Sequence, residues 1–150
     1  MTEIYFHSED INLPIALDEP QIQQWLIALA KEENQQISNL NYIFCSDEYL
    51  LNINKDYLNH DYYTDIITFD YSQEQVVAGD IYISIDRVAE NAEEFNVNFK
   101  EELMRVIAHG CLHLLGYKDK TEEEQTLMTK KEEASLSLLR KLSVPRGTSN

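Results

Sequence analysis

Cysteine is scarce in this 150-residue chain, and the two that occur follow no recognisable pattern. Cys45 and Cys111 lie far apart and form no CxxC pair. Two isolated cysteines argue against a disulfide framework, and they fit thiols that stay reduced in the cytosol. We therefore predict two reduced, largely buried thiols.

Long apolar runs are also missing. No segment approaches the roughly 20 consecutive apolar residues that span a bilayer. Residues 1–7 lack the basic stretch and apolar run of a signal peptide. The sequence therefore predicts a cytoplasmic protein with no membrane association.

Positive charge is in short supply, with 12 Lys and Arg against 27 Asp and Glu and a formal net charge of −15. Such a charge keeps a protein soluble but repels polyanions on average. Any contact with nucleic acid must therefore depend on a local basic patch or on a bound metal ion.

The rest of the composition, 43% hydrophobic and 26% charged, is that of an ordinary globular domain. Short runs of branched and aromatic residues predict strands at 4–7, 40–45, 66–69 and 79–85, the last two joined by a hairpin connection over 71–78. Apolar stripes with start signals predict helices with N-caps at Asp18, Asp47, Asn98 and Thr121, and a further helix that opens at Asp86. We expect one α+β domain over residues 1–142, followed by a flexible tail at 143–150.

One segment, His109-Gly-Cys-Leu-His113-Leu-Leu-Gly116-Tyr-Lys-Asp119, has the spacing of a metal site. His109 and His113 are four residues apart, so they lie on one face of the predicted helix. Gly116 can take a left-handed conformation where this helix ends, which turns the chain back and aims Asp119 at the same point. Three protein ligands with an open position are typical of catalytic zinc, which lowers the pKa of bound water to ~7. We predict one Zn²⁺ per chain at the end of a central helix.

Two histidines at helical spacing also occur by chance, without any metal. However, His113 and Asp119 stand in leucine-rich sequence, and polar groups in apolar company need partners. Cys111 lies two positions from each histidine, which turns it away on a helix, so we interpret it as a core thiol.

The same spacing resembles the H-E-x-x-H-x-x-G-x-x-H pattern of metzincin peptidases. Their general base is the glutamate directly after the first histidine, and Gly110 occupies that position here. A peptidase built on this helix would lack the group that activates its water.

The metal motif resembles the signature of the YbeY family, bacterial metal-dependent endoribonucleases of ribosomal RNA maturation. Upstream segments resemble further family blocks: Ile53-Asn54-Lys-Asp-Tyr57, Thr64-Asp65-Ile-Ile-Thr-Phe69, Gly79-Asp80-Ile81 and Ile85-Asp86-Arg87. The resemblance covers about residues 40–135. It implies a small α+β domain with a mixed sheet, here of about four strands with about five helices.

This resemblance implies a zinc-dependent single-strand endoribonuclease that acts at the small-subunit 3′ end and in ribosome quality control. Its partner would be a ribosomal RNA precursor or the ribosomal small subunit. Two positions depart from the family pattern, because its third ligand is usually histidine rather than Asp119, and an arginine usually stands where Leu58 is. Such an arginine would hold a phosphate. Lys55, His60 and Lys118 are nearby candidates to replace it.

Asp65 precedes a strongly predicted strand, where it could cap the strand, orient a ligand or accept a proton. The predicted metal ligands are His109, His113 and Asp119, and Lys55 and Asp65 complete the catalytic candidates. A different class of function, a metal-stabilised ribosome-assembly factor that binds without cutting, is favoured by Leu58. A metzincin-like peptidase is a third and weaker hypothesis. Oligomeric state is not predictable from these patterns.

Overall fold

The computed structural model describes residues 2–143, which form one four-stranded sheet and five helices. This confirms the predicted α+β class. In chain order the elements are β1 (Glu3–Ser8), α1 (Glu19–Glu32), β2 (Gln36–Cys45), α2 (Asp47–Leu58), β3 (Ile66–Asp70), β4 (Val76–Ser84), α3 (Ile85–Glu94), α4 (Phe99–Leu114) and α5 (Glu122–Leu142).

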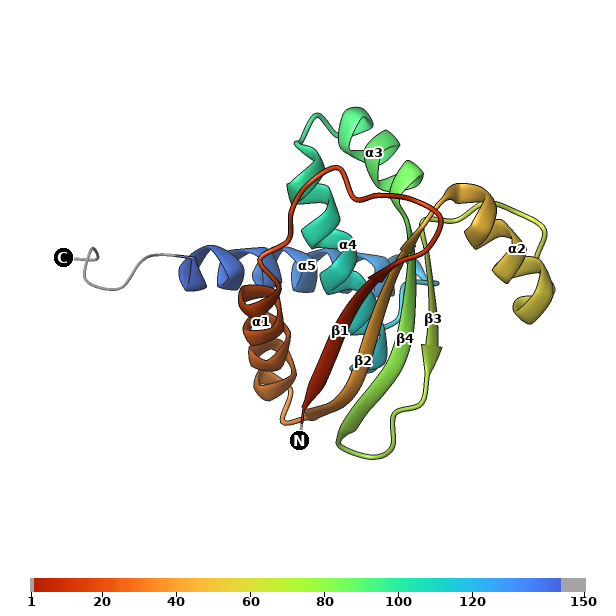
Figure 1. Cartoon of the computed structure of the whole chain (residues 1–150). Coiled ribbons are helices and arrows are strands. Elements are labelled where there is room, and N and C mark those ends of the chain that lie inside the picture. The colour runs from red at the N-terminus through yellow and green to blue at the C-terminus, as the bar shows by residue number, and fades with distance from the viewer. Residues whose placement is uncertain (1, 144–150) are drawn as a thin grey trace.

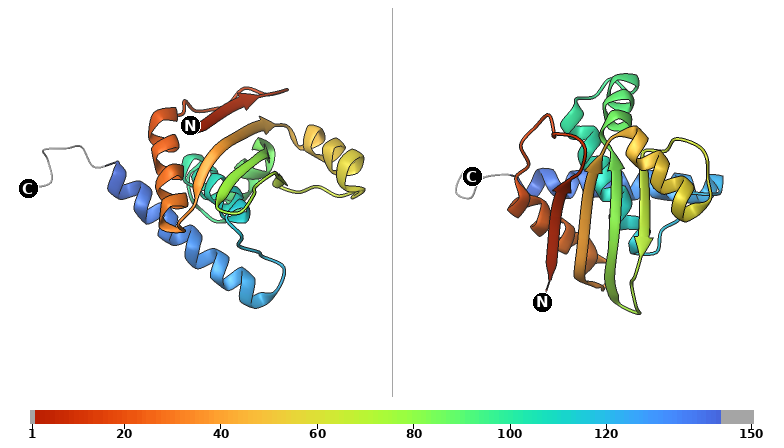
Figure 2. Two further views of the ribbon diagram at one scale, coloured as in Figure 1. Left: turned by 90° about the horizontal axis from the view of Figure 1, so that it is seen from below. Right: turned by 45° about the vertical axis from the view of Figure 1, so that its right-hand side comes forward.

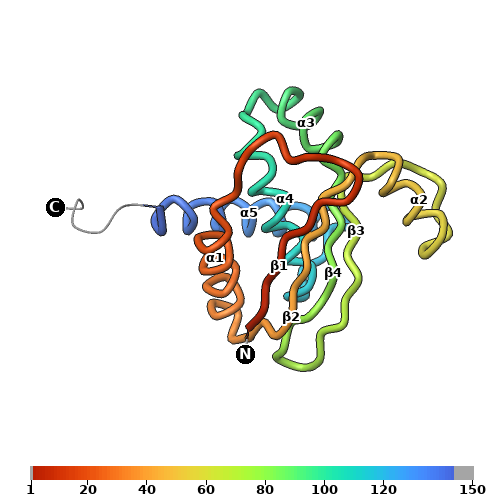
Figure 3. The backbone as a smooth tube through the Cα atoms, viewed as in Figure 1, coloured from red at the N-terminus to blue at the C-terminus, as the bar shows by residue number. Residues whose placement is uncertain are grey.

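The sheet is mixed, as predicted, with the strand order β1-β2-β4-β3 (Figures 1 and 3). β1, β2 and β4 run parallel, and α1 makes the crossover between β1 and β2. β3 pairs antiparallel with β4 at one edge. A tight turn closes this hairpin, with Glu74 at φ 53°. The predicted hairpin is therefore confirmed, but its connection spans 71–75 rather than 71–78, because residues 76–78 belong to β4.

Helices cover the two faces of the sheet unequally (Figure 2). α1, α4 and α5 contribute to the main core, which includes the fully buried Trp25, Phe44 and Ile107. Side chains alternate between the two faces of the sheet along each strand. The strand residues next to those of the main core therefore point to the opposite face. There Leu50 and Ile53 of α2 form a second, smaller cluster with Ile67 of β3.

α4 lies very close to the sheet because glycine stands at the crossing points. A Cβ atom on Gly110 would be 2.9 Å from Ile81 Cγ2 and 3.0 Å from Ile66 Cδ1. A Cβ atom on Gly79 would be 2.9 Å from Leu114 Cδ1. The C-terminal half of α4 is therefore placed directly against β3 and β4.

The predicted N-cap of α2 and the predicted start of α3 are each placed too late. Ser46 rather than Asp47 caps α2, and α3 begins at Ile85, capped by Ser84, rather than at Asp86. Each serine has an extended backbone directly before its helix, with its hydroxyl in reach of the third helical N–H. Asp47 instead pairs with Arg87 at 3.0 Å. The starts at Asp18, Asn98 and Thr121 are confirmed.

β2 and β4 begin earlier than predicted, at Gln36 and Val76, because they pair with each other over their whole length. Ser143 closes α5 and its hydroxyl accepts a 2.9 Å hydrogen bond from the Gln21 amide. The rest of the predicted tail, 144–150, lies outside the described residues. Within residues 2–143 no helix combines the length and apolar character that crossing a membrane requires.

Candidate metal centre

The end of α4 turns the chain back along the helix. Leu115 caps the helix and Gly116 follows with φ +114°. The Gly116 N–H donates to the His113 carbonyl and the Tyr117 N–H donates to the Leu112 carbonyl, both at 3.0 Å. This pair of bonds is a Schellman motif, which needs a positive φ at the glycine. The loop after it therefore returns toward the face of α4 that carries the histidines.

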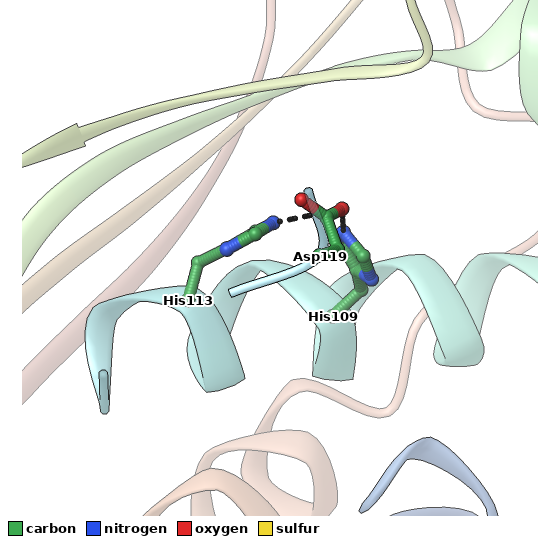
Figure 4. A group of neighbouring side chains, drawn as sticks. All are labelled: His109, His113 and Asp119. Carbon is green, nitrogen blue, oxygen red and sulfur yellow. Dashed lines mark ion pairs between the residues drawn. The ribbon is translucent and has the colours of Figure 1, made fainter. Parts of the chain in front are cut away.

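Asp119, on that loop, meets His109 and His113 above one face of α4 (Figure 4). Asp119 Oδ2 lies 3.2 Å from His109 Nε2 and 3.4 Å from His113 Nε2. One ligand atom from each residue lies within 4.8 Å of the others. The structure thus brings together the three residues that the spacing predicted as metal ligands.

The hydrogen bonds of the two imidazoles fit a metal ion at this point. His109 Nδ1 lies 2.6 Å from Glu132 Oε2, and His113 Nδ1 lies 3.0 Å from the Tyr117 carbonyl oxygen. Both partners are acceptors, so each Nδ1 carries a proton, and in the neutral form of each ring the Nε2 has a free lone pair. Two nitrogens and one carboxylate oxygen then face the same point, which is a zinc-type donor set.

Charges around the histidines make the centre electronegative. Burial lowers the pKa of His109, but its hydrogen bond to Glu132 and the nearby carboxylates raise that pKa by more. Burial raises the pKa of Glu132, and hydrogen bonds from His109 and Arg105 lower it by more. Glu132 and Asp119 therefore supply negative charge that a bound dication would neutralise.

Asp65 is a further carboxyl group close to this centre. Burial is the main cause that raises its pKa, the charge of His109 lowers it, and the negative charges of Asp119 and Glu132 raise it. The Asp65 carbonyl accepts the Ser84 N–H, which extends the β3–β4 ladder by one pair. Asp65 thus lies within electrostatic reach of the ligands without belonging to the group of three.

The predicted phosphate-binding residues lie on exposed surface. Lys55, on the last turn of α2, pairs with Asp61 at 3.4 Å, and this is its one ion pair within residues 2–143. His60 Nδ1 lies 2.9 Å from the Tyr62 hydroxyl and the two rings stack. Leu58 ends α2 with 39% of its surface exposed.

Lys118 is exposed beside Asp119 in the loop after α4. None of these cations contacts the three ligands among the ion pairs of the described chain.

Cys111 and Gly110 face away from the candidate metal centre. Cys111 is fully buried, as predicted, and burial raises the pKa of its thiol to about 12. Gly110 faces Ile66 and Ile81 of the sheet. A glutamate at position 110 would meet the sheet rather than a substrate, which counts against peptidase chemistry.

Glu132 and Arg105 are the residues of this centre that the sequence analysis missed. Glu132 lies on α5, far along the chain from His109, so no local spacing connects the two. Arg105 offered a weak signal, because Arg105, His109 and His113 recur every four residues on one face of α4.

Comparison with known proteins gives consistent matches over most of the chain. A family model described as Endoribonuclease YbeY matches residues 3–140. A protein named Endoribonuclease YbeY from Cytophaga hutchinsonii is 55% identical over 136 residues, covering 90% of this chain and 94% of that one. Its namesake from Parabacteroides distasonis is 45% identical, covering 91% and 95%. The solution structure of TM1509 from Thermotoga maritima superimposes with a TM-score of 0.61 at 26% identity, covering 98% and 99% of the two chains.

Proposed function

The chain belongs to the YbeY family and is an endoribonuclease of ribosomal RNA maturation, and we propose that His109, His113 and Asp119 hold the zinc ion that it uses. One observation carries the proposal: two Nε2 lone pairs and one carboxylate oxygen converge, while both Nδ1 atoms are already bonded. YbeY is a metal-dependent nuclease family. The choice of zinc follows from the nitrogen-rich, three-ligand donor set.

Bound at this position, a zinc ion supplies a Lewis acid for a phosphoryl oxygen and lowers the pKa of water to about 7. The chain's own residues must then orient the substrate and move the proton. We assign the proton transfer to Asp65, a carboxyl with a raised pKa that is not occupied as a ligand.

We assign phosphate binding to Lys55 and Lys118, in place of the arginine that Leu58 replaces. Both are exposed and Lys118 adjoins Asp119. Lys55 would exchange its exposed ion pair with Asp61 for a phosphate of the bound strand. Full RNA cleavage by both Lys55→Ala and Lys118→Ala would reject this assignment.

The proposed substrate is single-stranded RNA at the 3′ end of the small-subunit precursor, in the cytoplasm, with a further part in ribosome quality control. A net charge of −15 disfavours capture of free RNA. We therefore propose that the ribosomal small subunit presents the strand. RNA cleavage that changes little with salt supports presentation through protein contacts, whereas a steep loss with salt indicates lysine–phosphate contacts.

The direct test compares the wild-type protein with His113→Ala on a precursor RNA that contains the small-subunit 3′ end, each with added zinc. We expect cleavage by the wild type and at least a hundredfold loss in the variant, because one of three ligands is removed. Metal analysis of protein purified without chelators should find zinc near one equivalent in the wild type.

Equal cleavage by both proteins would indicate a contaminating nuclease and overturn the proposed site. Binding of the precursor without cleavage by either protein would instead support the non-catalytic assembly factor that Leu58 favours. Cleavage of unfolded casein is not expected, because Gly110 leaves no room for the glutamate of a metzincin.

A further inference from the structure

We propose that Glu132 of α5 is a positioning residue for the metal centre: it orients His109 as a ligand, and Arg105 holds Glu132 in place. The inference rests on the proposed metal ligands and adds two residues that do not touch the metal. It makes α5 part of the centre, although none of the three ligands belongs to that helix.

The Glu132 carboxylate uses both of its oxygens in this arrangement. Oε2 lies 2.6 Å from His109 Nδ1, and Oε1 lies 2.9 Å from Arg105 Nη1. The Glu132 side chain is only 11% exposed. A carboxylate that is removed from water needs such partners to stay ionised, so Arg105 and His109 together account for its burial.

An ionised carboxylate on Nδ1 has two effects on the opposite ring nitrogen. It keeps the proton on Nδ1, so the Nε2 lone pair stays available, and it makes the imidazole a stronger donor. His113 has only the Tyr117 carbonyl at the equivalent position. The two histidines are therefore unequal ligands, and His109 is the one that depends on a charge from outside its own helix.

A purely structural role for the same contacts makes a different prediction. If Glu132 and Arg105 serve only to join α5 to α4, removing the Glu132 charge lowers the stability of the metal-free protein and leaves zinc affinity unchanged. If Glu132 positions His109, zinc affinity falls as well. Metal affinity, measured separately from stability, distinguishes the two roles.

Glu133 provides a matched control. It contacts the same guanidinium through Arg105 Nη2, but its side chain is 57% exposed and it has no contact with His109. Glu132→Gln and Glu133→Gln thus remove the same charge from neighbouring residues that share Arg105. Of the two, only Glu132 is bonded to His109.

The experiment measures zinc affinity by competition with a chromophoric chelator for wild type, Glu132→Gln and Glu133→Gln, with circular dichroism to verify folding. We expect zinc binding about 10–100-fold weaker in Glu132→Gln and within about twofold of wild type in Glu133→Gln. Wild-type zinc affinity in a folded Glu132→Gln would overturn the inference, as would an equal loss in both variants.

A second variant keeps the test decisive if Glu132→Gln does not fold. Arg105→Gln leaves Glu132 in place but removes its cationic partner, so zinc binding should weaken several-fold. An unchanged zinc affinity would contradict the proposal that Arg105 holds Glu132 in place. His109→Ala tests the proposed metal site separately from the role of Glu132. If this variant and the wild type bind zinc equally, the proposed metal site fails; if only His109→Ala is impaired, the site stands and the role of Glu132 fails.

Discussion

At the residue scale, the carboxyl groups around α4 divide into those that form ion pairs and those that do not. Glu132 and Asp119 contact the histidines directly. The charge of Asp65 contributes to the raised pKa of Glu102, and neither side chain makes an ion pair within residues 2–143. Carboxyl groups of this second kind are suited to proton exchange, because burial favours the neutral form and no ion pair opposes it.

For Asp65 we predict a catalytic effect without a loss of metal. Asp65→Asn should lower single-turnover RNA cleavage by roughly 10²–10⁴-fold, the usual contribution of a general base. Zinc affinity, measured by chelator competition, should stay within a few-fold of wild type because Asp65 is outside the ligand group. A cleavage rate equal to that of the wild type would remove Asp65 from the mechanism.

The raised pKa of Glu102 predicts that the free energy of unfolding depends on pH. Burial raises its pKa from the ordinary value of 4.5 to about 7, the Arg105 charge lowers it, and neighbouring carboxylates add to the rise. Between these values the folded protein binds more protons than the unfolded chain, so the contribution of Glu102 to stability falls as pH rises from about 4.5 to 7.

Glu102→Gln should therefore be more stable than wild type at pH 8, by on the order of 1 kcal/mol, with the difference shrinking toward pH 5. Urea unfolding of metal-free protein at both pH values measures this, since a bound cation would itself favour the charged form of Glu102. A constant difference across the pH range would show that the Glu102 carboxyl does not titrate in this window.

At the element scale, the position of α4 against the sheet decides where the histidines stand. The helix crosses β3 and β4 at Gly110, directly after His109, and passes Gly79 near its C-terminus. At each glycine a Cβ atom would lie 2.9 Å from a side-chain carbon of the facing element, which is closer than a side chain allows. The same close approach that excludes a glutamate at position 110 thus sets the height of the two histidines above the sheet.

We predict that Gly110→Ala lowers the free energy of unfolding by about 1–3 kcal/mol, the usual cost of overpacking a core. The new methyl group would lie 2.9 Å from the branched Ile81 side chain and must displace it or α4. Urea denaturation measures the loss, and Ser137→Ala on the exposed surface of α5 is the control, expected within about 0.5 kcal/mol of wild type. Unchanged stability in Gly110→Ala would mean that α4 can move away from the sheet at little cost.

At the scale of the whole molecule, the candidate metal centre joins three parts of the chain. The histidines come from α4, Asp119 comes from the loop that follows, and Glu132 approaches from α5. α4 packs against the sheet, α5 packs against α4 and α1, and both helices contribute to the main core. Occupancy of the metal site should therefore stabilise the packing of α4 and α5 as well as the local loop.

Metal removal should lower the thermal unfolding midpoint of the whole domain. A ligand at about 1,000 times its Kd stabilises the native state by about 4 kcal/mol, which amounts to several degrees for a domain of this size. Differential scanning fluorimetry with zinc and with excess chelator measures the shift, and His113→Ala should show little of it. An equal shift in the variant would place the stabilising metal elsewhere.

Features that depend on neighbours along the chain were predictable from the sequence. The pairing of His109 with His113 follows from helical periodicity, and the turn at Gly116 follows from the helix end that a glycine permits. Asp119 is in reach because only the Tyr117 and Lys118 positions separate it from that turn. The α+β class and the β3–β4 hairpin likewise depend on local patterns.

The tertiary structure alone decided which distant groups surround those ligands. The Glu132–His109 and Arg105–Glu132 bonds, the electrostatic proximity of Asp65, and the steric exclusion at Gly110 all depend on how α4 packs against α5 and the sheet. No spacing in the chain encodes these contacts. Helix geometry is set within a few residues, whereas the partner of a ligand's second nitrogen is set by the packing of whole elements.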